Sequence, residues 1–347
     1  MNLLNILNNK ETKKLPIWIM RQAGRYLPEF RKLKKESKGF MNMVYNPKIA
    51  SDITLQPIKR FGFDAAIIFS DILIIPDALG QKLSYQEGKG PKLEKMSMDE
   101  MLKKLSIKKN NKKLKLVYEA IKRTKKKLNK NTNLIGFVGA PLTVSLFMFD
   151  NERKKEYIKI IRSYNKNKIK IKKIFNLLEK ATAEHAIGQI NAGAEIIQIF
   201  DTWAGILNNN NLNEYSIKPI IRICNIIKRK KPKIKIIVFP RNVGKNYVKY
   251  INKNIDCISV GEDIKLKEIK KIQEKKIIQG NLSPKTLFNG GNKLEKKTKE
   301  ILRKFSKKPF IFNLSHGIMP GTPIKNVEKL IKIVRNFKNE IWRWKRL

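Results

Sequence analysis

The sequence predicts an α/β protein of the (β/α)8 TIM barrel class, in which eight parallel strands alternate with helices. Eight short apolar runs rich in Ile, Val and Phe are separated by longer amphipathic stretches, a pattern typical of alternating strands and helices. Runs that are almost entirely apolar indicate strands buried on both faces, as in a parallel sheet covered by helices. Polar residues follow each run, where the catalytic face of a barrel would lie.

The predicted strands are residues 17–20, 65–69, 134–138, 196–200, 234–239, 257–260, 276–279 and 310–314. Their spacing is uneven, since about 45 residues separate the first two runs and about 65 separate the second from the third. We therefore expect extra helices in the early βα loops and a small excursion near residues 84–93. A doubly wound open sheet is the structural alternative.

The chain is expected to form one barrel domain over residues 1–347. A length of 347 residues exceeds the usual single-core limit of about 250 to 300, but one barrel with insertions reaches it. The two cysteines, Cys224 and Cys257, form no C-x-x-C pair, so neither a disulfide framework nor a zinc knuckle is indicated. The sequence shows neither a secretory signal nor an apolar membrane span, so we expect a cytoplasmic protein with no membrane partner.

The formal net charge of +47 raises the question of an anionic partner. Lysines occur in separate runs, at residues 103–115, 122–127, 166–173 and 228–233, rather than in one stripe. Because Lys, Asn and Ile share AT-rich codons, biased base composition explains the charge without a partner. Nucleic-acid surfaces more often combine arginine with stacking aromatics. We expect no specific nucleic-acid partner, and a polyanion-binding protein is the alternative function.

Unusual polar residues follow the predicted strands. Arg21 and Arg25 follow the first run, Asp71 the second, Thr202 the fourth and His316 the eighth. Because the carboxyl ends of barrel strands meet at one rim, two guanidinium groups should face one carboxylate there. Such a rim indicates an anionic small-molecule substrate.

Five sequence blocks resemble the uroporphyrinogen decarboxylase family, in the family's order. They are PIWIMRQAGRYLPEFR at 16–31, FGFDAAIIFSDILIIPDALG at 61–80, IIQIFDTWAG at 196–205, GNLSP at 280–284 and FNLSHGIMPGTP at 312–323. Because they span nearly the whole chain, the resemblance implies a barrel carboxy-lyase of porphyrin and haem biosynthesis. Such an enzyme removes the four acetate carboxyl groups of uroporphyrinogen III to give coproporphyrinogen III. The resemblance also implies a homodimer.

The resemblance implies a catalytic role for Asp71. Loss of carbon dioxide from a pyrrole-bound acetate would leave a carbanion, so the ring must first be protonated at carbon, and no cofactor is then required. A fixed carboxylate stabilises the resulting cation more than the neutral substrate. In the family this aspartate gathers the pyrrole NH groups, so Asp71 would serve each ring in turn. The structural alternative is that Asp71 caps the helix that follows it.

Arg21 and Arg25 are expected to be catalytic and to bind substrate carboxylates, because guanidinium binds them bidentately and stays charged when partly buried. The alternative is that both arginines form ion pairs on the surface of the protein. Since guanidinium pKa values exceed about 12, we expect proton delivery through water or substrate. The backbone of Gln22, Ala23 and Gly24 should shape the same rim, because glycine lets main-chain NH groups approach a ligand closely.

Thr202 and His316 complete the substrate contacts that we expect. His316 after the last strand fits a carboxylate-binding role, and Thr202 keeps a hydroxyl where the family commonly has serine. The alternative for His316 is a structural hydrogen bond, and the alternative for Thr202 is a helix N-cap. The other histidine, His185, is expected to be helical and structural.

Two positions depart from the family pattern. Phe147 stands where a tyrosine is usual, and losing a hydrogen bond to a charged group costs about 1.5 to 3 kcal/mol, which predicts weaker binding or slower turnover. Ser315 stands where a glycine usually precedes the histidine, so a catalytically weakened family member is a further alternative. Neither histidine is followed by a cysteine at the spacing of the zinc-binding cobalamin-linked methyltransferases, so no metal is expected.

Overall fold

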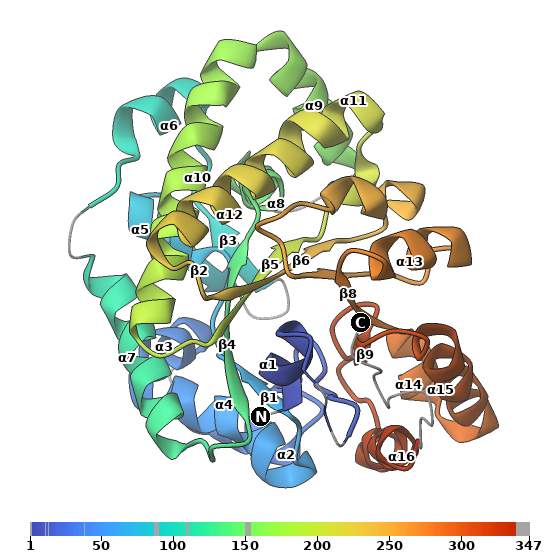
Figure 1. Cartoon of the computed structure of the whole chain (residues 1–347). Helices are drawn as coiled ribbons and strands as arrows, with labels where there is room; N and C mark the ends of the chain where they lie inside the picture. The colour runs from blue at the N-terminus through green and yellow to red at the C-terminus, as the bar shows by residue number, and fades with distance from the viewer. Residues whose placement is uncertain are drawn as a thin grey trace.

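The computed structural model describes residues 2–337, apart from residues 11, 13, 38, 87–89, 109–110 and 150–153. Parallel strands form a curled sheet in the order β1-β4-β5-β6-β7-β8-β9, with helices around its outside (Figure 1). The strands are β1 (Ala65–Ile67), β4 (Asn133–Gly139), β5 (Ile196–Asp201), β6 (Lys235–Pro240), β7 (Cys257–Ser259), β8 (Ile277–Leu282) and β9 (Phe310–Leu314). The predicted barrel class is confirmed, as are the positions of these strands.

Residues 17–20 fill the remaining position in the barrel. They do not form a regular strand, so the prediction of a strand here is wrong. Ile17 forms a single parallel bridge to Phe312, and its carbonyl accepts from the Asp64 N–H at 3.0 Å on the other side. On the β9 side the Phe312 N–H donates to the Pro16 carbonyl at 2.9 Å, and the Trp18 N–H donates to the Phe312 carbonyl at 3.4 Å. Side chains supply further partners. The Ile17 N–H donates to Asp64 Oδ2 at 2.7 Å, and the last N–H of the segment donates to Asn313 Oδ1 at 3.0 Å. The segment therefore closes the barrel without a continuous ladder.

The early loops carry the extra elements expected from the strand spacing. Before β1 lie α1 (Asn2–Leu7), α2 (Pro28–Glu36), α3 (Phe40–Tyr45) and α4 (Pro47–Phe61). Between β1 and β4 lie α5 (Ile74–Leu79), the antiparallel hairpin of β2 (Leu83–Gln86) and β3 (Gly90–Leu93), α6 (Met98–Lys104) and α7 (Lys112–Lys127). The predicted excursion near residues 84–93 is thus a hairpin, of which residues 87–89 lie outside the described residues.

The later elements follow the strand-helix alternation. After β4 come α8 (Pro141–Phe149), α9 (Lys154–Lys166) and α10 (Lys168–Asn191), and after β5 come η1 (Ala204–Ile206), α11 (Asn209–Leu212), the π-helical turn η2 (Asn213–Ile217) and α12 (Lys218–Lys230). After β6 come η3 (Gly244–Tyr250), α13 (Leu266–Gln273), α14 (Pro284–Asn289), α15 (Gly291–Phe305) and α16 (Ile324–Arg335), separated by the last strands.

The limits of α4 show how local sequence sets a helix. Asn46 caps its first turn, where the side-chain oxygen accepts from the Ile49 N–H at 3.1 Å, and Pro47 suits the first helical position. Gly62 ends the helix in a left-handed conformation, with φ 64°. Both ends therefore follow from residues next to the helix.

The amino-terminal end of the barrel is closed by α1. Leu3 and Ile6 of this helix are buried in one cluster with Trp18 and the first residues of several strands. Inside the barrel, Trp18 Nε1 donates to Gln279 Oε1 at 2.9 Å, and Gln279 Nε2 donates to Gln198 Oε1 at 3.2 Å. With this end filled, the carboxyl ends of the strands remain for a binding site.

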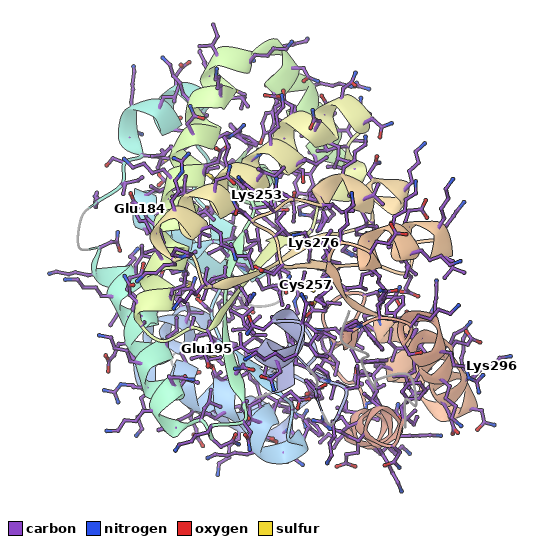
Figure 2. All side chains as sticks on the ribbon, in the orientation of Figure 1. Glu184, Glu195, Lys253, Cys257, Lys276 and Lys296 are labelled. Carbon is purple, nitrogen blue, oxygen red and sulfur yellow. The ribbon has the colours of Figure 1, made fainter. Side chains whose placement is uncertain are left out.

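The excess of basic residues lies on the outer surface. Figure 2 shows long side chains ending in nitrogen that project from helices on all sides of the molecule, Lys296 of α15 among them. Exposed ion pairs on single helices, such as Lys299–Glu295 and Lys104–Glu100, contribute little to stability. The charge is therefore spread over the surface rather than gathered into one stripe.

The two cysteines are both buried and free, so they form no disulfide with each other. Burial raises the pKa of the Cys224 and Cys257 thiols, which keeps them protonated. Within the described part of the chain, no helix has both the length and the apolar character needed to cross a membrane.

The closing contact at Asp64 predicts a large effect of the Asp64→Ala change. Its Oδ2 also lies 2.8 Å from Arg335 Nη2, so the change leaves a largely buried guanidinium and the Ile17 N–H without this partner. We expect the free energy of unfolding to fall by about 3 to 5 kcal/mol in urea titrations. The exposed Arg60–Glu29 pair is the control, and Glu29→Ala should cost less than about 1 kcal/mol. Equal losses would contradict a special role for the closing contact.

Candidate active site

A cavity of about 450 Å³ lies at the carboxyl ends of the strands. Its floor contains three phenylalanines from consecutive strands of the sheet: Phe137 of β4, Phe200 of β5 and Phe239 of β6. Their rings pack edge to face, with centroids 5.8 Å apart for Phe137 and Phe200 and 6.4 Å apart for Phe200 and Phe239. An aromatic floor of this kind suits the face of a flat, largely apolar molecule.

Charged and polar residues surround this floor. Of the nine residues predicted to act on or bind a substrate, seven line the cavity: Arg21, Ala23, Gly24, Arg25, Asp71, Thr202 and His316. They come from the loops after the closing segment, β1, β5 and β9. Parts of the chain that are far apart in sequence therefore meet at one rim, as the strand pattern predicts.

Gln22 lies beneath the rim rather than in the cavity wall. Its fully buried side chain donates to the Ala65 carbonyl at 2.9 Å, and the Tyr26 hydroxyl donates to the Gln22 carbonyl at 2.8 Å. These bonds tie the loop that carries Arg21 and Arg25 to the start of β1. The side chain of Gln22 therefore positions its neighbours.

Arg21 has a left-handed backbone conformation, φ 60°, which is uncommon outside glycine. Its side chain lies against Gly317, where an added Cβ would come within 2.3 Å of Arg21 Cδ. The side chain reaches solvent through the cavity, but protein surrounds it on most sides. This desolvation lowers the pKa of the Arg21 guanidinium; Asp71 acts in the opposite direction, and Arg241 and Arg25 add to the lowering. A bound anion would relieve this poorly solvated cation.

Asp71 is a partly buried carboxyl in the cavity wall. Its Oδ1 accepts from the Leu73 N–H at 2.8 Å. Burial raises the pKa of Asp71, while this hydrogen bond and the charge of Arg21 lower it in part. Leu73 is the N-cap position of α5, so the bond from its N–H to Asp71 holds the turn that leads into this helix, which is a structural role as well.

Thr202 and His316 reach the cavity from the loops after β5 and β9. The N-cap position of η1 is Trp203 without a side-chain capping bond, so Thr202 is not the N-cap of that turn. Ser315, just before His316, donates its hydroxyl to Glu262 Oε1 at 2.9 Å. This serine therefore links the turn that presents His316 to the loop after β7.

Phe147 lies outside the cavity wall. It is a half-buried residue of α8 and packs edge to face on Tyr157 of α9, with ring centroids 6.4 Å apart. Tyr157 in turn packs on Trp203, with centroids 5.0 Å apart. The structure thus places Phe147 in an aromatic cluster next to the β5 loop, and its contact with substrate stays a prediction.

One wall of the cavity was missed by sequence reasoning. Lys34 of α2, Phe40 of α3 and Tyr85 of β2 line it, and the rings of Phe40 and Tyr85 stack with centroids 4.8 Å apart. The alternation of apolar and polar residues in 83–86 is a strand signal. No local signal indicates that this hairpin turns toward the barrel rim.

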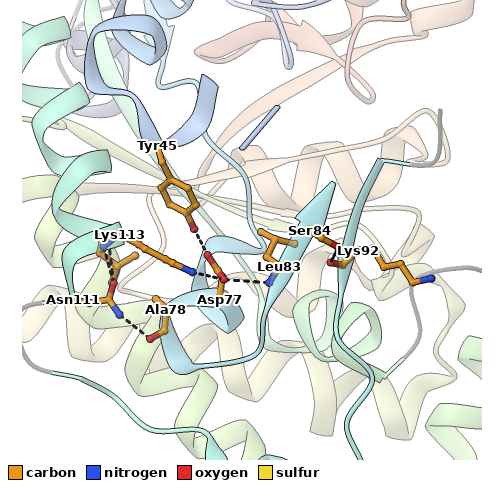
Figure 3. Close-up of polar contacts among 9 residues, drawn as sticks. Tyr45, Asp77, Ala78, Leu83, Ser84, Lys92, Asn111 and Lys113 are labelled. Atoms are coloured by element: carbon orange, nitrogen blue, oxygen red, sulfur yellow. Dashed lines mark hydrogen bonds and ion pairs between the residues drawn. The ribbon is translucent and has the colours of Figure 1, made fainter. Parts of the chain in front are cut away.

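The hairpin is anchored by the buried carboxylate of Asp77 (Figure 3). Asp77 accepts hydrogen bonds from the Tyr45 hydroxyl at 2.6 Å, Lys113 Nζ at 2.7 Å and the Leu83 N–H at 3.2 Å. Elements α3, α5, α7 and β2 therefore converge on one side chain. This convergence fixes the wall that contains Tyr85.

A second buried carboxyl, Asp201, lies at the end of β5 beside Thr202. It accepts hydrogen bonds from the hydroxyls of Thr143, at 2.6 Å, and Ser216, and the Ser216 hydroxyl lies 2.7 Å from that of Tyr250. Burial raises the pKa of Asp201 to about 6, against the lowering effect of its hydrogen bonds. This carboxyl joins the loops after β4, β5 and β6 below the rim.

The arrangement as a whole can bind carboxylates and stabilise a positive charge. Arg21 and Arg25 supply fixed cations for the first task, and Asp71 supplies a poorly solvated anion for the second. Within the described residues, no group of three His, Cys, Asp or Glu side chains is placed to hold a metal ion.

The raised pKa of Asp201 predicts a pH-dependent cost to folding. Because the folded pKa of about 6 exceeds the unfolded value of 3.8, ionisation favours the unfolded chain as the pH rises through this range. The cost at neutral pH is about 3 kcal/mol. The free energy of unfolding of the wild type minus that of Asp201→Asn should therefore fall between about pH 4 and pH 7.

Urea unfolding at a series of pH values measures this difference. Asp99→Asn removes an exposed carboxylate and should give no such slope. A pH-independent difference for Asp201→Asn would mean that Asp201 does not titrate in this range.

Comparisons with known proteins agree with this chemistry. A family model described as uroporphyrinogen decarboxylase matches residues 1–337. A curated relative named uroporphyrinogen decarboxylase, from Orientia tsutsugamushi (strain Ikeda), is 46% identical over 96% of this chain and 98% of its own. Another with that name, from Rickettsia africae (strain ESF-5), is 42% identical over 94% of each chain.

Similar solved structures bear on the fold alone. A methyltransferase from Methanosarcina mazei aligns with a TM-score of 0.76 over 96% of this chain and 97% of its own, at 18% sequence identity. A B12-independent methionine synthase from Shewanella sp. W3-18-1 aligns with a TM-score of 0.56 over 92% and 93%, at 14% identity. At such identities a shared barrel does not carry an activity across.

Proposed function

Because the chain belongs to the uroporphyrinogen decarboxylase family, we propose that the cavity at the carboxyl ends of its strands is the active site of that decarboxylase. The protein is a carboxy-lyase of porphyrin and haem biosynthesis, which removes the four acetate carboxyl groups of uroporphyrinogen III to give coproporphyrinogen III. The observation that supports the location of the site is the meeting of Arg21, Arg25 and Asp71 in one cavity.

Each decarboxylation replaces a carboxyl group with a proton. A proton adds to a ring carbon of the pyrrole, and the cationic ring then accepts the electron pair of the breaking carbon–carbon bond as carbon dioxide leaves. The remaining methylene group is protonated and the ring carbon gives its proton back. Because the protonated ring is the electron sink, we propose that the enzyme uses no cofactor.

Asp71 is proposed to stabilise the ring cation and to gather the pyrrole NH groups. An opposite unit charge about 4 Å away at an effective dielectric near 20 is worth about 4 kcal/mol, or about a thousandfold in rate. Burial raises the pKa of Asp71, so its carboxylate gains more from a cationic ring than from a neutral one. This difference favours the transition state over the bound substrate.

Arg21 and Arg25 are proposed to hold the acidic side chains of the substrate. Desolvation lowers the pKa of Arg21, so its charged form gains from a bound carboxylate. Ala23 and Gly24 line the same edge and would offer main-chain NH groups. Gln22 supports that loop through its bond to β1.

Thr202 and His316 are proposed as hydrogen-bonding partners of substrate carboxylates, since both line the cavity beside the arginine loop. The phenylalanine floor would take one face of the macrocycle. Together these contacts divide the cavity into an apolar floor and a polar rim.

We further propose that residues 1–347 form one domain, that the enzyme works in the cytoplasm and that it is a homodimer. In uroporphyrinogen decarboxylases the clefts of the two subunits lie near each other. Light scattering after size-exclusion chromatography measures the oligomeric state. No specific nucleic-acid partner is proposed, because the charge of +47 is spread over the outer helices.

Replacing Asp71 with Asn should lower kcat by about a thousandfold, because the amide cannot supply the negative charge. Anaerobic conversion of chemically reduced uroporphyrin without added metal, with products separated by carboxyl number, measures the effect. Asp52→Asn removes an exposed carboxylate and should leave the rate unchanged. A wild-type rate from Asp71→Asn would refute its role, and no turnover by folded wild type would favour a weakened enzyme or a polyanion-binding protein.

Phe147→Tyr should raise kcat/KM about tenfold, because it restores a hydroxyl that can hydrogen-bond a substrate carboxylate. Phe149→Tyr is the matched control, since Phe149 lies on the same helix and packs on Tyr164 instead. The same assay measures both variants. Equal kcat/KM for Phe147→Tyr and wild type would show that this position does not reach the substrate.

A further inference from the structure

A second cavity, of about 490 Å³, lies between α5, α7 and α10. None of the described residues lines both this cavity and the active site. Its walls are mainly apolar and include Ile75 and Leu79 of α5, Leu114 of α7, and Ala181 and Ile187 of α10. Small-molecule sites have volumes of about 300 to 1,000 Å³ and walls of this character.

Two polar aromatic side chains lie together in the wall of this second cavity. The rings of Tyr118 and His185 stack with centroids 5.5 Å apart, and the Tyr118 hydroxyl lies 3.2 Å from His185 Nδ1. His185 is helical, as the sequence predicts, and 2% exposed. Burial lowers the pKa of His185 to about 3, so its ring is neutral at physiological pH.

The neutral ring of His185 leaves one hydrogen-bonding atom for a ligand. When Nδ1 accepts from Tyr118, the proton of the imidazole is on Nε2. Among the described residues, Nε2 has no hydrogen-bond partner. A donor in a cavity wall that has no protein partner can donate to a ligand or to water.

The second cavity is held open by specific contacts. Gly188 makes room for Tyr118, because an added Cβ would come within 2.2 Å of Tyr118 Cζ. Asn111 also lines the cavity and donates to the Ala78 carbonyl at 2.8 Å, which joins the start of α7 to α5 (Figure 3). Specific contacts of the fold therefore determine the shape of this cavity.

Positive charge surrounds the edge of the second cavity. Lys108, Lys115 and Lys122 are exposed there, and among the described residues no carboxylate pairs with any of them. Glu184 of α10 is the acidic residue of the described lining, and Figure 2 shows it on the α5 side of the molecule. Three lysines less one glutamate leave an excess of two positive charges.

We propose that the second cavity binds an amphipathic monocarboxylate, with its apolar body inside and its carboxylate at the lysine edge. The apolar walls disfavour a fully hydrophilic anion such as phosphate, and the lysines disfavour a cation. The Nε2 donor of His185 suits a carbonyl or hydroxyl oxygen on the body of the ligand. The two cavities have separate walls, so a ligand bound here would not contact the substrate.

Fluorescence titration of the full chain with a dansyl-labelled undecanoate, followed by displacement with decanoate, tests the proposal. We expect saturable one-to-one binding at roughly 0.15 M salt. Changing Lys108, Lys115 and Lys122 together to Gln should weaken binding about tenfold. The absence of saturable binding to wild type would overturn the proposal.

A matched triple variant separates specific binding from attraction to a basic surface. Changing Lys112, Lys126 and Lys130 together to Gln removes the same charge from exposed positions outside the cavity lining, and should change Kd less than about twofold. Equal weakening by the two triple variants would refute a site at this cavity.

Two further variants locate the bound probe. Ala181→Leu reduces the cavity volume, so it should weaken probe binding about tenfold while decarboxylation continues at the wild-type rate. Arg21→Gln should leave probe affinity unchanged. Loss of probe binding in Arg21→Gln would mean that the probe occupies the substrate cavity, and would also overturn the proposal. If Ala181→Leu does not fold, the lysine variants still decide the outcome.

Discussion

The closure of the barrel by residues 17–20 is the contact on which the active site depends. This segment is held from both sides by a few backbone bonds and by two side chains, Asp64 next to β1 and Asn313 within β9, without a regular ladder. Because Arg21 and Arg25 follow it directly, their positions relative to the loop after β1 are set by the bonds that complete the barrel. The loop to which we assign substrate recognition is therefore positioned by the same interactions that close the fold.

Burial then determines the electrostatics of the cavity. The same loss of hydration lowers the pKa of Arg21 and raises that of Asp71, so the charged form of each is less stable than in water. Their mutual attraction offsets this only in part. In the mechanism that we propose, a substrate carboxylate would stabilise Arg21 and a ring that becomes cationic would stabilise Asp71, so the second interaction would grow as the reaction proceeds. The proposed site is in this sense matched to a substrate that has acidic side chains and a ring that becomes cationic during the reaction.

Local patterns predicted the parts of the structure whose causes are local. Strands buried on both faces leave an apolar run in the sequence, so β4 and β5 could be located to within a residue. The irregular closing segment could not, because the side chains that help to hold it come from 47 and 293 positions away. Motif spacing likewise placed Arg21 and Asp71 at one rim, but it does not state which face of α8 turns toward the cavity, and Phe147 lies outside the wall.

Because this protein has few carboxylates, each buried carboxylate is unusually important to the structure. With 76 Lys and Arg against 29 Asp and Glu, cations exceed carboxylates by 47, and their mutual repulsion opposes folding. Asp64, Asp77 and Asp201 are buried instead, where each joins elements distant in sequence. Salt screens exposed charges beyond about 8 Å at roughly 0.15 M, but buried charges much less. Because a surface of exposed lysines does not distinguish one anion from another, we propose that selection of a tetrapyrrole comes from the guanidinium groups of the cavity.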